Sequence, residues 1–202
     1  MNGRNLAGIT HSLLHLVTKG ASLQVVLRNI NQFAIALVEA ESSTTWIKEG
    51  VDLIVCKDTA YPLCQTQPVG GMAVKIRDDK GVGLTAYMAN QFNLGPGGHK
   101  IFNLSYASIV GHYAYGGGKP VNTCFPVSTT SLSILCVPLI GEVDCKILGL
   151  IKVENRLDPL GFPCGDRFSD DQADLIKQFA GIVATRILSH PNVDLSLARS
   201  FI

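Results

Sequence analysis

The segment Ser131–Arg156 reads SLSILCVPLIGEVDCKILGLIKVENR and carries the strongest structural signal in the chain. Two apolar runs rich in branched residues, 132–140 and 146–154, flank the turn sequence Gly141-Glu142-Val143-Asp144. Runs of this length around a short, glycine-containing turn predict an antiparallel β-hairpin. Because both runs are apolar at most positions, we expect them in the centre of the sheet.

Three segments outside the hairpin show the spacing of amphipathic helices, with apolar residues every three or four positions. The first covers residues 5–19 and is broken by Gly20, the second runs from residue 23 to residue 40, and the third runs from residue 169 to residue 190. The third begins with Ser169-Asp170-Asp171-Gln172, a capping box with glutamine three residues after the capping serine. These segments predict two helices before the sheet and one after it.

The remaining elements are shorter. We predict strands over residues 44–48, 52–57 and 72–77, with the polar cluster Ser42-Ser43-Thr44-Thr45 ending the second helix. Residues 84–91 and 106–112 are expected to form short helices in an otherwise irregular, glycine-rich middle. The order of these elements predicts an α+β fold with an antiparallel sheet and flanking helices.

Composition and charge argue against several classes of protein. The 202 residues are 47% apolar and only 16% charged, against about 25% charged in an average domain, which indicates a globular rather than a disordered chain. The net charge of +1 lacks the basic excess of a nucleic-acid-binding protein. No spanning segment and no secretory signal are visible in the sequence, so we expect a cytoplasmic protein with reduced thiols and no membrane partner.

The six cysteines do not indicate a metal site, because none forms a C-x-x-C pair and their spacings do not fit a zinc centre. Cys56 and Cys136 lie within apolar runs and are predicted to be buried. Cys124 and Cys164 lie in loop-like segments and are the candidates for exposed or reactive thiols.

Five segments in order make the chain resemble a GAF domain over residues 20–190. They are Ala21–Leu27 (ASLQVVL), Gly83–Ala89 (GLTAYMA), Ser131–Leu139 (SLSILCVPL), Ile147–Arg156 (ILGLIKVENR) and Phe168–Ala180 (FSDDQADLIKQFA). The resemblance implies a GAF-like (PAS/profilin-like) six-stranded antiparallel sheet. It also implies helices packed on one face and a small-molecule pocket under loops and short helices on the other.

The same resemblance implies a sensory module of a signalling protein, with a homodimer formed through the terminal helices. In this reading residues 1–20 are an N-terminal helix, residues 21–190 are the GAF domain, and residues 191–202 are a tail or the start of a linker. The apolar faces of residues 5–19 and 173–188 are expected to form the dimer seam. The alternative is that both faces pack on the domain itself.

The motifs of the specialised GAF subfamilies are mostly not matched by this sequence. No cysteine is followed by histidine, so covalent attachment of a bilin is not expected. Cyclic-nucleotide GAF domains carry N-K and F-x-x-x-D-E; Asn155-Arg156 and Phe168 match in part, but Gln172-Ala173 replaces the acidic pair, so this function is left open and is not our expectation. The catalytic cysteine of the GAF enzyme that reduces methionine sulfoxide is absent from Gly81–Ala86, so no cofactor is assigned and no catalytic residue is named.

The segment from Lys80 to Gly141 contains no Asp or Glu, although the chain has 16 acidic residues. The resemblance places this segment over the pocket, and a wall with cations and no carboxylates favours an anionic or neutral ligand. The alternative is that the segment is a neutral lid. Aromatic and polar residues of this segment are the candidate ligand-binding residues, since pockets combine apolar walls with a few polar groups: Phe102, Tyr106, His112, Tyr113, Tyr115 and Asn122.

Two other functions remain open at this stage. The chain could be a redox or hydrolytic enzyme that uses Cys124 or Cys164, or a ligand-free scaffold for dimerisation. Our first expectation is a sensory domain that binds a metabolite and passes the change through its terminal helices to a signalling partner, by a shift in conformational populations.

Overall fold

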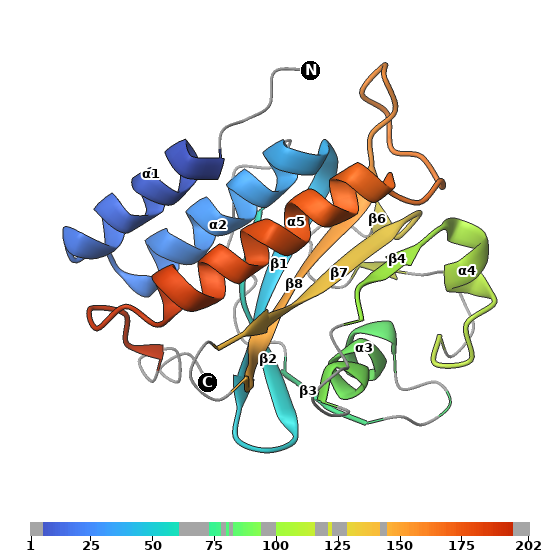
Figure 1. Ribbon diagram of the computed structural model, residues 1–202. Helices are drawn as coiled ribbons and strands as arrows, with labels where there is room; N and C mark the ends of the chain where they lie inside the picture. Colours follow the sequence, from blue (N-terminus) through green and yellow to red (C-terminus); the bar gives the residue numbers. More distant parts are fainter. Residues whose placement is uncertain are drawn as a thin grey trace.

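A six-stranded antiparallel sheet in the order β3-β2-β1-β8-β7-β4 forms the centre of the protein (Figure 1). The computed structural model describes residues 6–60, 73–77, 80, 83–93, 100–115, 121–122, 129–141 and 145–195. The strands of the sheet are β1 Ala40–Glu49, β2 Leu53–Ala60, β3 Ala73–Lys75, β4 Phe102–Leu104, β7 Ile134–Ile140 and β8 Ile147–Arg156. A separate two-stranded pair joins β5 Val121–Asn122 to β6 Thr129–Thr130.

The hairpin predicted from the sequence is confirmed as β7 and β8, which pair from Ile134↔Glu154 to Ile140↔Ile147. β8 also pairs with β1 and is therefore central in the sheet. Gly149 is a strict requirement of this packing, because a Cβ atom there would lie 2.0 Å from the carbonyl oxygen of Trp46. The α+β class and the antiparallel sheet predicted from the sequence are confirmed.

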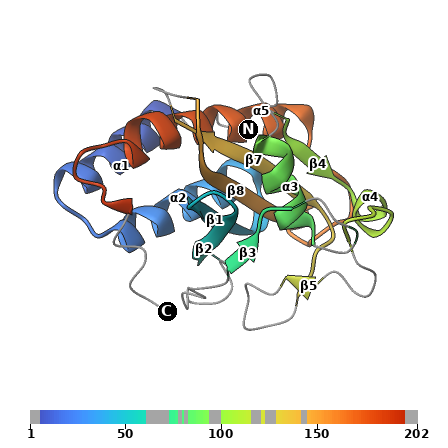
Figure 2. The same ribbon diagram turned by 90° about the horizontal axis from the view of Figure 1, so that it is seen from below.

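Long helices cover one face of the sheet, and short helices lie on the opposite side (Figures 1 and 2). The long helices are α1 Leu6–Thr18, α2 Leu23–Val38 and α5 Asp170–Ile182, and α5 continues as the π-helical turn η1 Val183–Leu188. The short helices are α3 Leu84–Asn93 and α4 Tyr106–Val110. Among the described residues, no helix is long and apolar enough to cross a membrane.

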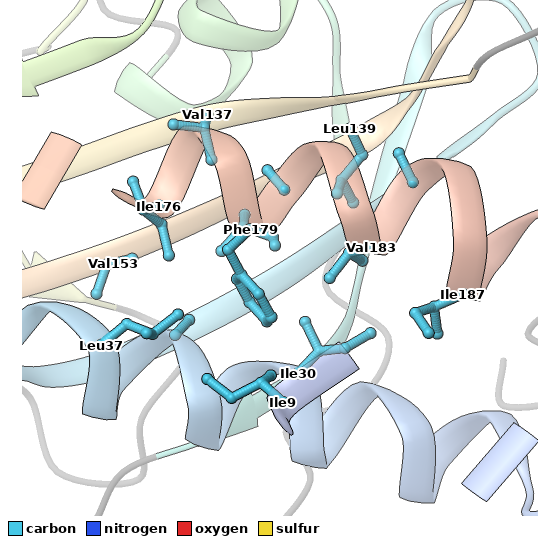
Figure 3. Close-up of a cluster of buried hydrophobic side chains, with 14 of the residues drawn as sticks. Ile9, Ile30, Leu37, Val137, Leu139, Val153, Ile176, Phe179, Val183 and Ile187 are labelled. Atoms are coloured by element: carbon cyan, nitrogen blue, oxygen red, sulfur yellow. The ribbon is translucent and has the colours of Figure 1, made fainter. Parts of the chain in front are cut away.

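Side chains of the central strands alternate between two buried clusters. Ile151 and Val153 of β8 belong to the cluster beneath the long helices, with Phe179, Val183 and Ile187 (Figure 3). Leu150 of β8 belongs to the second cluster, on the α3 side, with residues of α3 and β7. This period-two alternation places each residue of a strand on one face or the other.

The helices begin within one residue of the predicted positions, but α2, α3 and α4 each end two residues away from the prediction, at Val38, Asn93 and Val110. The capping box of α5 is present, with the Ser169 hydroxyl accepting from the Gln172 amide and the Gln172 side chain accepting from the Ser169 amide. α2 ends at Val38, and Glu39 takes a left-handed conformation with φ of 53°. The Ser42–Thr45 cluster does not end the helix as predicted, because these residues lie inside β1.

The Ser42–Thr45 cluster forms strand because its polar groups find buried partners across the sheet and under α2. The Ser43 and Thr45 hydroxyls donate to Oδ1 of Asn31, at 2.9 and 2.8 Å. Asn31 in turn donates to the carboxylate of Asp58 at 3.0 Å. Threonine is also a favourable strand residue, since its branched side chain fits a pleated surface.

The apolar faces of the terminal helices are buried within the domain. Ile9, Leu13 and Val17 of α1 and the apolar face of α5 all contribute to the cluster beneath the helices. Of the two alternatives raised by the sequence, the structure therefore shows packing on the domain itself, and these faces are not available as the expected dimer seam.

Candidate functional site

Polar residues occupy the middle of the sheet face that α3 covers. Thr44 of β1, Lys152 of β8, Cys136 of β7 and Phe102 of β4 are register partners in one row across four strands. Residues opposite one another in neighbouring strands point to the same face. The row therefore brings an ammonium, a hydroxyl, a thiol and an aromatic ring onto one surface.

Lys152 and Glu154 form a buried ion pair on this face. The distance from Nζ of Lys152 to Oε2 of Glu154 is 3.0 Å, and the two side chains are only 8% and 2% exposed. Glu154 also accepts a hydrogen bond from the Ser131 hydroxyl at 2.6 Å. Lys152 donates to the hydroxyl of Thr85, in the first turn of α3, at 3.4 Å.

Trp46 and Thr44 form the β1 side of the site. The indole nitrogen of Trp46 donates to the Thr44 hydroxyl at 3.0 Å, and that hydroxyl also donates to the Lys152 carbonyl at 3.5 Å. The Lys152 ammonium lies 6.0 Å from the centre of the Trp46 ring, within range of a cation–π contact. Trp46 is the one tryptophan in the sequence, so its fluorescence reports on this face alone.

An aromatic cluster borders the polar row where α3 faces β4 and the turn after α4. Tyr87 of α3 lies at its centre, with ring centroids 5.8 Å from Phe102, 4.5 Å from His112 and 5.3 Å from Tyr113. His112 and Tyr113 stack with centroids 5.1 Å apart, and Phe102 also meets Phe92 of α3 at 5.4 Å. Edge-to-face pairs at these distances are favourable, and Tyr113 is 50% exposed, so the cluster extends to the surface of the domain.

The structure brings together three of the six residues proposed from the sequence, Phe102, His112 and Tyr113. Tyr115 is half-buried against the apolar cluster on the α3 side. Desolvation and then the neighbouring Tyr106 raise the pKa of the Tyr115 hydroxyl above its ordinary value.

The last two candidate residues lie apart from this cluster or outside the described part. Tyr106 is 42% exposed and packs against Gly165 in the loop after β8, where its amide donates to the Gly165 carbonyl. Asn122 lies in β5, but its side chain lies outside the described residues.

Sequence reasoning missed Lys152, Glu154, Trp46 and Tyr87. The signal for the first two was present, because two charges spaced by two residues within an apolar central strand must point to the same covered face. The acid-free segment from Lys80 to Gly141 suggested a site wall without carboxylates. The site does contain a carboxylate, however, because β8 supplies Glu154 from outside this segment.

The sequence context predicted the burial of the cysteines only in part. Cys56 and Cys136 are buried, as expected, and burial strongly raises the pKa of the Cys136 thiol. Cys164 is partly exposed, with its sulfur accepting a hydrogen bond from Arg156 Nε at 3.4 Å. Cys145 is exposed although the sequence did not single it out, and Cys64 and Cys124 lie outside the described residues.

Within the described part of the chain, no group of three or more His, Cys, Asp or Glu side chains could hold a metal ion. The candidate site is therefore a sheet face with a buried ion pair and an aromatic border. Its polar groups can hold ligand charges by hydrogen bonds, and its rings can cover an apolar ligand body.

Comparison with known proteins identifies the fold. No protein-family model matches the sequence, and a search of the curated proteins finds no match. Solved structures do match. The GAF domain of a phosphoenolpyruvate-protein phosphotransferase from Coxiella burnetii is 15% identical, with a TM-score of 0.59 and coverage of 91% of this chain and 93% of that one.

Two further solved structures agree. The GAF domain of the Acinetobacter phosphoenolpyruvate-protein phosphotransferase is 14% identical, with a TM-score of 0.58 and coverage of 88% and 89%. Residues 122 to 287 of a methyl-accepting chemotaxis protein are 13% identical, with a TM-score of 0.57 and coverage of 88% and 94%. The chain has a GAF-like fold.

Proposed function

We propose that the chain is a regulatory GAF-type domain that binds a small molecule on the sheet face beneath α3. The observation that carries this proposal is the buried Lys152–Glu154 pair beside the aromatic cluster around Tyr87. Charged side chains with a few specific partners next to apolar ring surface are the usual composition of a ligand site. The GAF-like fold, found in proteins named for phosphotransfer and chemotaxis, supports a signalling role.

The ligand we propose is an anionic or neutral metabolite. Lys152 supplies a cation on the site face, and the segment from Lys80 to Gly141 supplies no acidic residue. The residues proposed to contact it are His112, Tyr113, Tyr115, Asn122, Phe102 and Tyr106, together with Lys152 and Glu154.

The proposed relay runs from this face to α5 through β4. Phe102 belongs to the aromatic cluster, and the next residue, Asn103, makes two hydrogen bonds with the backbone of Phe168. These bonds are 2.8 and 3.0 Å long, and Phe168 directly precedes the capping box of α5. A ligand that moves Phe102 would therefore bias the start of α5, which is a population shift of the terminal helix.

The partner of this relay is a signalling output protein or domain. We propose that residues 21–190 form the sensory unit, that residues 1–20 and 191–202 connect it to its partner, and that the protein acts as a cytoplasmic homodimer. Because the apolar faces of α1 and α5 are buried in the domain, such a dimer would use the exposed sides of these helices.

One observation favours a second function, a thiol-dependent redox enzyme. Cys164 is partly exposed, and its sulfur accepts a hydrogen bond from Nε of Arg156 at 3.4 Å, which places an accessible thiol beside a cationic side chain. A catalytic thiol should react rapidly with a disulfide reagent at neutral pH and be protected by substrate, whereas a structural thiol should show neither property.

A thermal-shift screen with matched sets of anionic, neutral and cationic metabolites tests the sensory function. We expect stabilisation by anionic or neutral members, accompanied by a change in Trp46 emission, because a ligand that binds only the folded state raises the melting temperature. Stabilisation by cationic members alone would reverse the proposed ligand class. No stabilisation by any member, together with light scattering that shows a stable dimer, would favour a ligand-free scaffold.

A further inference from the structure

We infer that the ligand held on the α3 face is a zwitterion, an α-amino acid with a large apolar side chain whose carboxylate meets Lys152 and whose ammonium meets Glu154. This inference rests on the ligand-binding function proposed above and assigns the chemistry of the ligand. The charges on the central strand, their spacing and their distance from the aromatic cluster point to this ligand.

Stability does not account for an ion pair at this position. Lys152 and Glu154 lie in the central strand, where the neighbouring residues on the same face belong to an apolar cluster. Replacing a buried ion pair by apolar residues of similar volume is often neutral or stabilising, because both charges lose hydration on burial. Recognition of a charged ligand therefore explains this ion pair better than a contribution to stability does.

A ligand with both charges fits this pair better than an anion alone. An anion that approached Lys152 would also face the Glu154 carboxylate, which lies 3.0 Å from the ammonium and is held by Ser131. A zwitterion replaces this repulsion by a second attraction, because its ammonium can lie beside Glu154. The ammonium nitrogen and carboxyl carbon of an α-amino acid are about 2.5 Å apart, close to the spacing of the protein pair.

The start of α3 favours the orientation with the carboxylate at Lys152. Thr85 in the first turn of α3 accepts a hydrogen bond from Lys152, and that turn contains no acidic residue. The amino-terminal end of a helix carries partial positive charge, which adds to the charge of the ammonium. The positive side of the site is therefore the α3 side, and the negative side is Glu154.

The aromatic cluster sets the size of the apolar side chain. Phe102 is two strands away from Lys152 in the same row, through Cys136. Strands lie about 4.8 Å apart, so the row places the ring about 10 Å from Lys152. A side chain as long as that of phenylalanine or leucine can extend from the ion pair toward the ring surfaces of Phe102 and Tyr87, whereas alanine cannot.

The test compares three probes that share one apolar body. L-Phenylalanine carries both charges, 3-phenylpropionate lacks the ammonium, and phenethylamine lacks the carboxylate. We measure their dissociation constants by calorimetry and by Trp46 emission, with L-alanine as the probe without a large side chain. We expect L-phenylalanine to bind and each analogue to bind at least about tenfold more weakly, since one charged hydrogen bond contributes a factor of this order or more.

Two variants test the two charged contacts of the ligand separately. In Glu154→Gln the advantage of L-phenylalanine over 3-phenylpropionate should fall to about threefold or less, and in Lys152→Met its advantage over phenethylamine should fall in the same way. Lys177→Met, on the exposed side of α5, is the matched control and should leave both ratios unchanged. A ratio measured within one variant does not depend on how far that variant is destabilised.

The possible outcomes distinguish a failure of the zwitterion inference from a failure of the proposed sensory function. If 3-phenylpropionate binds as tightly as L-phenylalanine, or if neither variant changes the ratios, the zwitterion is wrong while a ligand site remains. If none of the four probes binds but another metabolite stabilises the protein, the inference is overturned and the sensory function stands. If no metabolite binds at all, the sensory function fails with it.

Discussion

Replacing Asn31 by alanine should remove the buried hydrogen bonds that connect α2 to the sheet. Asn31 is fully buried and makes three hydrogen bonds: it accepts from the Ser43 and Thr45 hydroxyls and donates to Asp58. The two hydroxyl bonds contribute about 1 kcal/mol each and the bond to the charged carboxylate about 2 kcal/mol, so the free energy of unfolding should fall by about 4 kcal/mol. This is a large part of the 5–15 kcal/mol, roughly, that stabilises a typical domain.

Urea unfolding followed by the emission of Trp46 measures this loss. For a slope of about 2 kcal/mol per molar urea, the midpoint of Asn31→Ala should lie about 2 M below that of the unmodified protein. Asn29→Ala is the matched control, because Asn29 is on the same helix and makes one exposed hydrogen bond to the Val25 carbonyl. Its midpoint should move by less than about 0.3 M, since exposed substitutions change stability by less than about 0.5 kcal/mol.

The reasoning is refuted if Asn31→Ala and Asn29→Ala unfold at the same urea concentration. That result would mean that the Ser43, Thr45 and Asp58 groups find equivalent partners without the amide. An unchanged midpoint with a changed slope would point instead to an altered unfolded state.

Three further predictions concern the sheet and its thiols. Gly149→Ala should lower the free energy of unfolding by more than about 3 kcal/mol, because its Cβ would meet the Trp46 carbonyl oxygen. Gly181→Ala, on open helix surface, is the control and should raise the free energy of unfolding by about 1 kcal/mol. Equal melting temperatures of the two variants in thermal unfolding would contradict this packing. Burial raises the pKa of Cys136, so the folded state keeps a proton that the unfolded state releases. Stability should therefore fall above about pH 9 by about 1.4 kcal/mol per pH unit, and a pH dependence that persists in Cys136→Ala would exclude this cause. A thiol reagent should modify Cys145 in the native protein and leave Cys136 unmodified until unfolding, as peptide mass mapping would show; early modification of Cys136 would contradict its burial.

Much of the architecture follows from local patterns in the sequence. The hairpin of β7 and β8 was predicted because both runs are apolar, and the start of α5 because a capping box satisfies its first amide groups. The end of α2 was placed two residues late, and the Ser42–Thr45 cluster was taken as a terminator. Their polar groups are satisfied by Asn31 and by the neighbouring strands, partners that no local pattern reveals.

The candidate site was predicted less completely than the fold. Phe102, His112 and Tyr113 come together, but the residue at the centre of their cluster, Tyr87, lies on α3 and was not expected there. Strand β4 was not predicted either, because its three residues gain their structure from pairing with β7. The pairing of Lys152 with Glu154 depends on burial by α3, a tertiary effect that outweighs the preference of charged residues for water.

The same logic explains the faces of the terminal helices. Their apolar stripes were compatible both with a dimer seam and with packing on the domain, since periodicity marks which face is buried but not what covers it. The structure covers the stripe of α5 with residues of α2 and of the central strands (Figure 3).

Native mass spectrometry of the protein as purified, beside the Lys152→Met variant, tests the central claim most directly. Small-molecule binding at the α3 face predicts an added mass that is lost on denaturation and is reduced or absent in the variant. The same added mass in both proteins would place the ligand away from Lys152. A bare chain in both, with no change in Trp46 emission across the metabolite screen, would contradict the claim that this face binds a small molecule.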